Sequence, residues 1–115
     1  MIPTGARVLV AAKPVDFRKG PDSLMALVRE SGADPFSGAL YVFRSRRADR
    51  IKILVWDASG LVLVWKQLEG NVFRWPPIVN GVMRLSPVEF AALFDGFDWS
   101  RMQTPKRIPR PTAAA

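Results

Sequence analysis

The sequence predicts an α+β fold, in which a single domain is built on a curled antiparallel β-sheet of about five strands with two helices against one face. Three observations predict it. The chain has 115 residues, 49% of them hydrophobic, which suits one domain with a real core. Short β-rich runs follow one another between Arg7 and Met83, separated by Gly, Pro and Asp. Helical spacing of apolar residues occurs twice, after Pro21 and after Ser86.

The strands are predicted from runs that alternate in hydrophobicity or are rich in Val, Ile, Leu and aromatic residues. They cover residues 7–12, 39–44, 50–56 and 61–68, with short further segments at 72–75 and 78–83. In the run 50–56, Ile51, Ile53 and Val55 are expected on one face of the sheet, opposite Lys52 and Leu54. A hairpin tip is predicted over 46–49 and a turn over 58–60.

Both helices have recognisable ends. Pro21 suits the first turn of a helix, and Gly32 is placed to end that helix. Ser86 and Glu89 have the spacing of a capping box at the start of the second helix, and Gly96 follows its last apolar residue. The domain is therefore predicted over residues 1–101.

Residues 102–115 are predicted to form a disordered tail, because they offer little apolar surface and contain several prolines. The tail is also basic, and its cationic residues after the domain are Lys106, Arg107 and Arg110.

The composition argues against an enzyme. The chain has neither cysteine nor histidine, which excludes disulfides, thiol nucleophiles and the usual zinc ligands, and removes the commonest acid–base side chain. The carboxylates that remain as conceivable metal ligands are Asp57, Glu69, Asp95 and Asp98. Asp57 is better explained as part of an ordinary hairpin turn. We therefore expect no catalytic residue, no metal and no cofactor.

No apolar run has the length of a membrane span, and the N-terminus lacks the pattern of a secretion signal. A cytoplasmic protein without a membrane partner is expected.

The net charge of +7 is concentrated rather than spread evenly. One cluster lies at the predicted hairpin and comprises Arg44, Arg46, Arg47, Arg50 and Lys52. A basic turn carried on a sheet favours contacts with DNA phosphates, which give affinity without reading sequence. The alternative is that these side chains are simply solvated and keep the sheet from aggregating.

A second basic site precedes the first helix. Arg18 and Lys19, with backbone amides at the helix N-terminus, are candidates for holding a phosphate. The alternative, which we favour here, is that Asp16 or Asp22 caps the helix and Arg18 pairs with a carboxylate.

Tryptophan predicts either core or contact surface. Core burial is the preferred interpretation for Trp56 and Trp65. The segment Phe73, Arg74, Trp75 and Pro76 is a candidate anchor for a protein partner, because Trp and Arg favour interface hot spots. For Trp75 core burial is an equally good interpretation.

The ordered part of the chain resembles a known family from about Arg7 to Trp99. The landmarks are VDFRKG at 15–20, DPFSG at 34–38, FR at 43–44, RIKILVWD at 50–57, KQLEG at 66–70 and FRWP at 73–76, before the closing Leu-rich helix. Phe17 and Gln67 stand where the family often has Met and Arg. The chain is similar to the TnpB-type accessory protein, the second reading frame of insertion sequence family sixty-six.

The resemblance implies a protein encoded beside a separate, larger transposase that supports DNA transposition, with no catalytic residues to carry over. The expected partners are DNA, at element ends or target, and that transposase. The alternative is a protein–protein adaptor that recruits the transposase without significant DNA binding. A sheet this short is also expected to leave an edge for homo-oligomer pairing, which the sequence does not locate.

Overall fold

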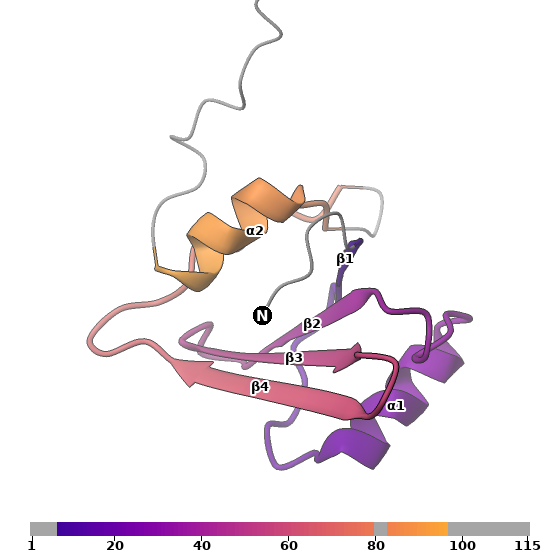
Figure 1. Ribbon diagram of the computed structural model, residues 1–115. Coiled ribbons are helices and arrows are strands. Elements are labelled where there is room, and N and C mark those ends of the chain that lie inside the picture. Colours follow the sequence, from indigo (N-terminus) through magenta and orange to yellow (C-terminus); the bar gives the residue numbers. More distant parts are fainter. Residues whose placement is uncertain (1–6, 80–82, 97–115) are drawn as a thin grey trace, which may run out of the picture.

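The computed structural model describes residues 7–79 and 83–96, which form a four-stranded sheet and two helices (Figure 1). The elements in order are β1 (Val8–Val10), α1 (Pro21–Glu30), β2 (Leu40–Arg44), β3 (Arg50–Trp56), β4 (Leu61–Gln67) and α2 (Pro87–Phe94). The α+β prediction is confirmed, whereas the predicted tail lies outside the described residues. Neither helix in these ranges is long and apolar enough to cross a membrane.

The sheet has the order β1-β2-β3-β4 and is mixed rather than wholly antiparallel. β1 runs parallel to β2, and the other two pairings are antiparallel. The parallel pair arises because α1 returns the chain to the start of the sheet, so that β2 runs in the direction of β1. The expected fifth strand is also absent from the described residues, where Met83 forms only a single bridge with Val10.

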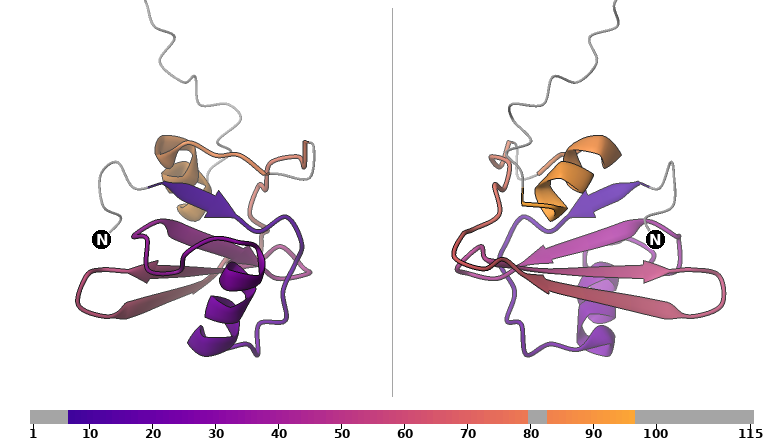
Figure 2. Two further views of the ribbon diagram at one scale, coloured as in Figure 1. Left: turned by 90° about the vertical axis from the view of Figure 1, so that its right-hand side faces the viewer. Right: turned by 60° about the vertical axis from the view of Figure 1, so that its left-hand side comes forward.

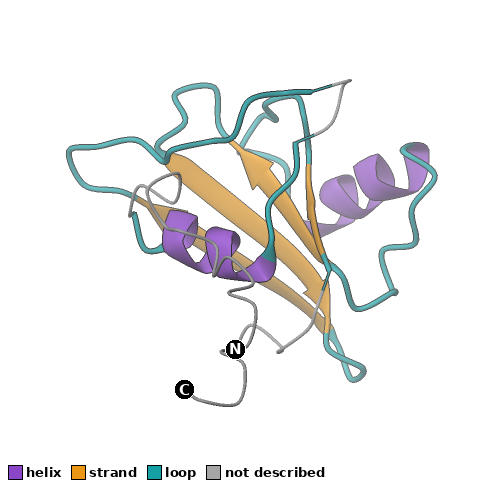
Figure 3. Cartoon of the chain, turned by 90° about the horizontal axis from the view of Figure 1, so that it is seen from above, coloured by secondary structure: helices purple, strands orange, loops and turns teal. Residues whose placement is uncertain are grey.

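The two helices cover opposite faces of the sheet, which corrects the expectation that both lie on one face (Figures 1 and 2; Figure 3 shows the arrangement from above). On one face Phe90 and Leu93 of α2 pack against Ile51 and Ile53. On the other face Leu24 of α1 packs in a cluster that includes Tyr41, Phe43 and Leu54. β2 and β3 are therefore buried on both sides, as their nearly continuous apolar sequences require.

The predicted helix ends are present. Pro21 is the first residue of α1, and Gly32 beyond its end has φ +86°. Ser86 Oγ accepts a hydrogen bond from the Glu89 backbone N–H at 3.1 Å, and Glu89 Oε1 accepts one from the Ser86 N–H at 2.9 Å. This completes the capping box of α2.

Candidate nucleic-acid interface

The turn between β2 and β3 presents the most basic part of the chain. The Ser45 N–H donates to the Arg50 carbonyl at 3.2 Å, and the Ala48 N–H donates to the Ser45 carbonyl at 3.0 Å. This geometry closes the hairpin at the predicted place and leaves Arg46 and Arg47 exposed at its tip. Among the described residues, neither of these two arginines has an ion-pair or hydrogen-bond partner.

The loop that precedes α1 lies against this turn. The Val15 N–H donates to the Arg44 carbonyl at 3.0 Å, and Arg44 Nη2 donates to the Ala12 carbonyl at 2.8 Å. The loop before α1 and the turn after β2 are far apart in the sequence, and these hydrogen bonds hold them together at the edge of the sheet face that α1 covers. Arg44 is half-buried and engaged with the loop, so its guanidinium is partly used in the structure rather than presented at the surface.

Lys52 fixes the same loop from inside. Its side chain is 8% exposed, and its Nζ donates to the carbonyls of Phe17 at 2.6 Å and Lys19 at 2.8 Å. The ammonium also lies 5.0 Å from the centroid of the Phe17 ring. Burial lowers the pKa of Lys52. These contacts correct the expectation that Lys52 reaches a phosphate, because its charge faces the protein.

Between the loop and the turn is a polar groove with a volume of about 630 Å³. Four arginines and two aspartates contribute to its walls, which gives a net charge of +2. These residues are Arg18, Arg46, Arg47, Arg50, Asp16 and Asp49. We call this feature the basic groove. Sequence reasoning named the hairpin and Arg18 separately but did not predict that they share one groove.

Two of the groove's arginines, Arg18 and Arg50, are less available to a ligand than the pair at the tip of the turn. Arg18 is exposed and forms an ion pair with Asp16, with Nη2 and Oδ2 2.7 Å apart. The side-chain hydrogen bonds from Arg18 hold the pKa of Asp16 far below its usual range, so this carboxylate stays ionised. The expected pairing of Arg18 with a carboxylate is therefore confirmed. Arg50 is half-buried, and its Nε has no hydrogen-bond partner among the described residues.

The remaining basic candidates lie elsewhere. The Lys19 side chain is half-buried and does not line the groove, while its backbone N–H donates to the Asp16 carbonyl at 3.0 Å. Lys106, Arg107 and Arg110 lie outside the described residues.

The segment predicted as a partner anchor supports the basic turn instead. The Phe73 N–H and the Trp75 Nε1–H both donate to the Ala48 carbonyl, at 2.8 and 3.3 Å. Phe73 is 2% exposed within the α2-side core, and Pro76 is also buried. This corrects the expectation that Phe73 and Pro76 contact a partner. Trp75 is half-buried, and only Arg74 of this segment is exposed.

The other tryptophans and carboxylates can also be placed. Trp56 is half-buried and meets the Phe36 ring edge-on at 5.2 Å, whereas Trp65 is 53% exposed, which corrects its expected burial. Asp57 Oδ1 accepts hydrogen bonds from Ser59 and Gly60, as the turn interpretation predicts. Within residues 7–79 and 83–96, no group of three acidic side chains is arranged to hold a metal ion.

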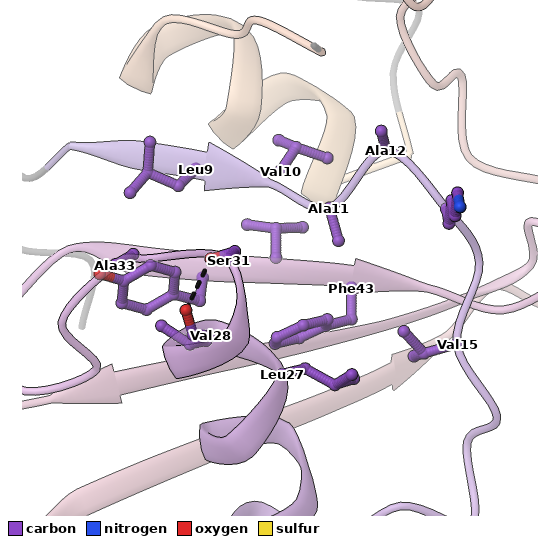
Figure 4. Close-up of a pocket in the computed structure, with 13 residues that line it drawn as sticks. Leu9, Val10, Ala11, Ala12, Val15, Leu27, Val28, Ser31, Ala33 and Phe43 are labelled. Atoms are coloured by element: carbon purple, nitrogen blue, oxygen red, sulfur yellow. Dashed lines mark hydrogen bonds between the residues drawn. The ribbon is translucent and has the colours of Figure 1, made fainter. Parts of the chain in front are cut away.

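An apolar pocket of about 510 Å³ lies between β1 and α1 (Figure 4). Leu9 and Ala11 line one side of it, and Leu27 and Val28 line the other. The Ser31 hydroxyl at this pocket is already used within the protein, because Oγ donates to the Val28 carbonyl at 2.6 Å. A ligand site needs a few converging polar groups that orient the ligand. We therefore interpret this pocket as a loosely packed part of the core rather than as a ligand site.

Comparison with known proteins agrees with the landmarks in the sequence. Residues 6–104 match the family described as "IS66 Orf2 like protein". Two similar proteins come from Sinorhizobium fredii (strain NBRC 101917 / NGR234). "Uncharacterized protein y4jC" is 45% identical over 96% of this chain and 95% of its own length. "Uncharacterized protein y4hO" is 35% identical over 97% of each chain. No solved structure matches this chain significantly.

The family match implies an accessory role associated with a transposable element, and it extends over nearly all of the described fold. From its sequence landmarks and this match, the chain belongs to the IS66 Orf2-like family.

Proposed function

We propose that this protein assists DNA transposition by binding the DNA backbone through the basic groove, beside a separate transposase. The observation that supports this most is the convergence of Arg18 with Arg46, Arg47 and Arg50 in one groove. A DNA partner fits an accessory protein of a transposable element, and the net charge of +7 fits a polyanion.

The chemistry of the groove suits phosphates. Exposed guanidinium groups form bidentate, charge-assisted hydrogen bonds with phosphate oxygens. Arg46 and Arg47 are exposed and without partners in the described structure, so they bind an anion without first breaking an internal ion pair. Asp16 and Asp49 lower the net charge of the groove but leave it positive. Contacts of this kind give affinity and position and carry no direct sequence information.

The groove is also held in shape before any ligand arrives. Lys52 fixes the loop wall, and the Ala48 carbonyl ties the turn to Phe73 and Trp75. A site formed in advance loses less conformational entropy on binding. The adaptor alternative has less support, because two residues of its expected surface, Phe73 and Pro76, are buried.

The test is fluorescence anisotropy with two labelled duplexes, the terminal repeat of the element and a scrambled sequence, at several salt concentrations. We expect the double variant Arg46→Ala/Arg47→Ala to bind both duplexes more weakly by a similar factor. The slope of log affinity against log salt should fall by roughly 2, about one unit for each lost phosphate contact.

The matched control is Arg29→Ala/Arg84→Ala, which removes the same charge from exposed positions outside the groove. It should change the slope much less. Equal effects of the two double variants would show that only net charge matters, and unchanged binding by Arg46→Ala/Arg47→Ala would exclude the groove.

A further inference from the structure

Within residues 7–79 and 83–96, the outer edge of β4 has no strand beside it. β4 pairs with β3 along its whole length, and no other strand in the described part of the chain pairs with it (Figures 1 and 2). Edge strands usually avoid association by means of a proline, a bulge or an outward lysine. The sequence LVLVWKQ has no proline, and its register with β3 is unbroken.

The one charge on β4 does not guard the edge. Lys66 Nζ donates to the Phe94 carbonyl of α2 at 2.6 Å and lies 4.6 Å from the centroid of the Phe94 ring. The ammonium is thus engaged with α2 above the sheet. An incoming strand would not have to displace a solvated lysine from the edge.

The backbone groups that face outward follow from the register. The Asp57 N–H donates to the Gly60 carbonyl at one end of the hairpin, and the Leu68 N–H donates to the Asp49 carbonyl at the other. Antiparallel pairs alternate between hydrogen-bonded and non-hydrogen-bonded. The hydrogen bonds at the two ends of the hairpin are consistent with one pattern, in which the backbone groups of the even-numbered residues of β4 bond to β3. The residues whose backbone groups point outward, with no hydrogen-bond partner in the described part of the chain, are Leu61, Leu63, Trp65 and Gln67.

The side chains beside this edge are apolar. Trp65 is directly opposite Lys52 in the register, so it lies on the α1 face of the sheet, and 53% of it is exposed. Leu61 and Leu63 are half-buried on the same face. A large exposed aromatic side chain next to an unpaired strand edge is typical of an interaction surface.

We propose that β4 pairs with β4 of a second copy, antiparallel and centred on Val64, so that the two sheets become one. This register gives the longest overlap of the outward backbone groups. Leu61 then pairs with the partner's Gln67, and Leu63 with the partner's Trp65, so every outward group of one strand meets one of the other. Trp65 becomes covered by a leucine on its own face of the sheet.

The pattern of charge also fits a second copy. In this register Lys66 is opposite the partner's Val62, so the pairing sets no like charges directly against each other.

The chain's own residues 102–115 are a poorer candidate for pairing with the β4 edge, because Pro105, Pro109 and Pro111 lack the N–H that a regular ladder needs.

Such a dimer would orient both basic grooves in the same direction. The groove lies on the α1 side, where Val15 and Phe17 pack, and an antiparallel pair has its two-fold axis normal to the sheet. Strand rise and spacing place the tips of the two turns roughly 40 Å apart, slightly more than one turn of B-DNA. This consequence rests on the proposed function, whereas the pairing itself does not.

Cysteine cross-linking tests the pairing directly, since the chain contains no cysteine. In a non-hydrogen-bonded pair the two Val64 Cα atoms would be about 4.5 Å apart, within the range for a disulfide. With oxidised glutathione, Val64→Cys should form a covalent dimer at least tenfold faster than Leu61→Cys, whose partner is about 20 Å away. Equal rates, or no dimer from either variant, would overturn the proposal.

Sedimentation equilibrium gives a second measurement without cysteine. The wild type should approach twice its 12.8 kDa mass, and Trp65→Lys should remain a monomer over the same concentrations. Val88→Lys, a change at an exposed valine of α2, should dimerise like the wild type. A monomeric wild type, or a Trp65→Lys dimer as stable as the wild type, would contradict the proposal. Arg46→Ala/Arg47→Ala should dimerise normally, so loss of DNA binding and loss of pairing are distinguishable.

Discussion

Replacing Lys52 with methionine should destabilise the protein and loosen the basic groove, although Lys52 has its charge inside the protein. The methionine side chain has nearly the same length as that of lysine and occupies the same space, so the packing around the aliphatic part of the side chain is retained. What is lost is the ammonium that donates to the carbonyls of Phe17 and Lys19.

The expected magnitude follows from these two acceptors. A buried polar group left without its partner costs about 1–3 kcal/mol. Burial of the ammonium is itself unfavourable, as the lowered pKa of Lys52 indicates, so removal of the charge offsets part of this loss. We expect the free energy of unfolding to fall by roughly 2 kcal/mol, a large part of the 5–15 kcal/mol typical of a domain.

Urea denaturation measures the stability change, and anisotropy with a labelled duplex measures the change at the groove. Lys66→Met is a matched control, because Lys66 also donates to a carbonyl but on the α2 side, away from the loop at 13–20. Lys66→Met should lose about 1 kcal/mol and keep its DNA affinity. If Lys52→Met unfolds at the same urea concentration as the wild type, or affects DNA binding no more than Lys66→Met, the role assigned to Lys52 is wrong.

Two further predictions concern the same region. Ala48 has φ +62°, a conformation that favours glycine, so Ala48→Gly should raise the free energy of unfolding by about 0.5–1 kcal/mol in urea titrations; a decrease would contradict the strain. Asp16→Asn should lower the urea midpoint at neutral pH. The pKa of Asp16 is depressed in the folded state, so its ion pair with Arg18 stabilises the fold at pH values above 3.8, the ordinary pKa of this group. The difference from the wild type should begin to narrow as pH falls below 3.8 and should go on narrowing at lower pH, and a difference that does not narrow at all below 3.8 would refute the ion-pair explanation.

Local periodicity predicted local structure well. The alternation in β3 placed Ile51, Ile53 and Val55 on one face and Leu54 on the other, as the core clusters confirm. The capping box of α2 depends only on residues three positions apart and was equally readable. The pairing of β1 was missed, although a strand, a helix and a further strand in sequence are the usual components of a parallel pair.

The composition of the site was less predictable than the position of the turn. Arg46 and Arg47 were expected at the tip and are found there. Lys52 was expected to join them at the surface but is buried. Alternation along a strand gives the face on which a residue lies, and it does not show whether another segment covers that face. Its cover is the loop at 13–20, which contacts it across more than thirty residues of sequence. No local pattern reports such a contact.

The basic turn and the segment at 73–76, which the sequence predicts as a partner anchor, form one structural unit. The Ala48 carbonyl accepts hydrogen bonds from Phe73 and Trp75, and Phe73 packs in the same core as Phe90 of α2. A truncation of Phe73 or Trp75 would therefore disturb the groove as well as any surface nearby, and loss of transposase recruitment in such a variant would not separate an adaptor from a DNA-binding protein. Arg46 and Arg47 do separate the two, because they project from the turn without supporting it.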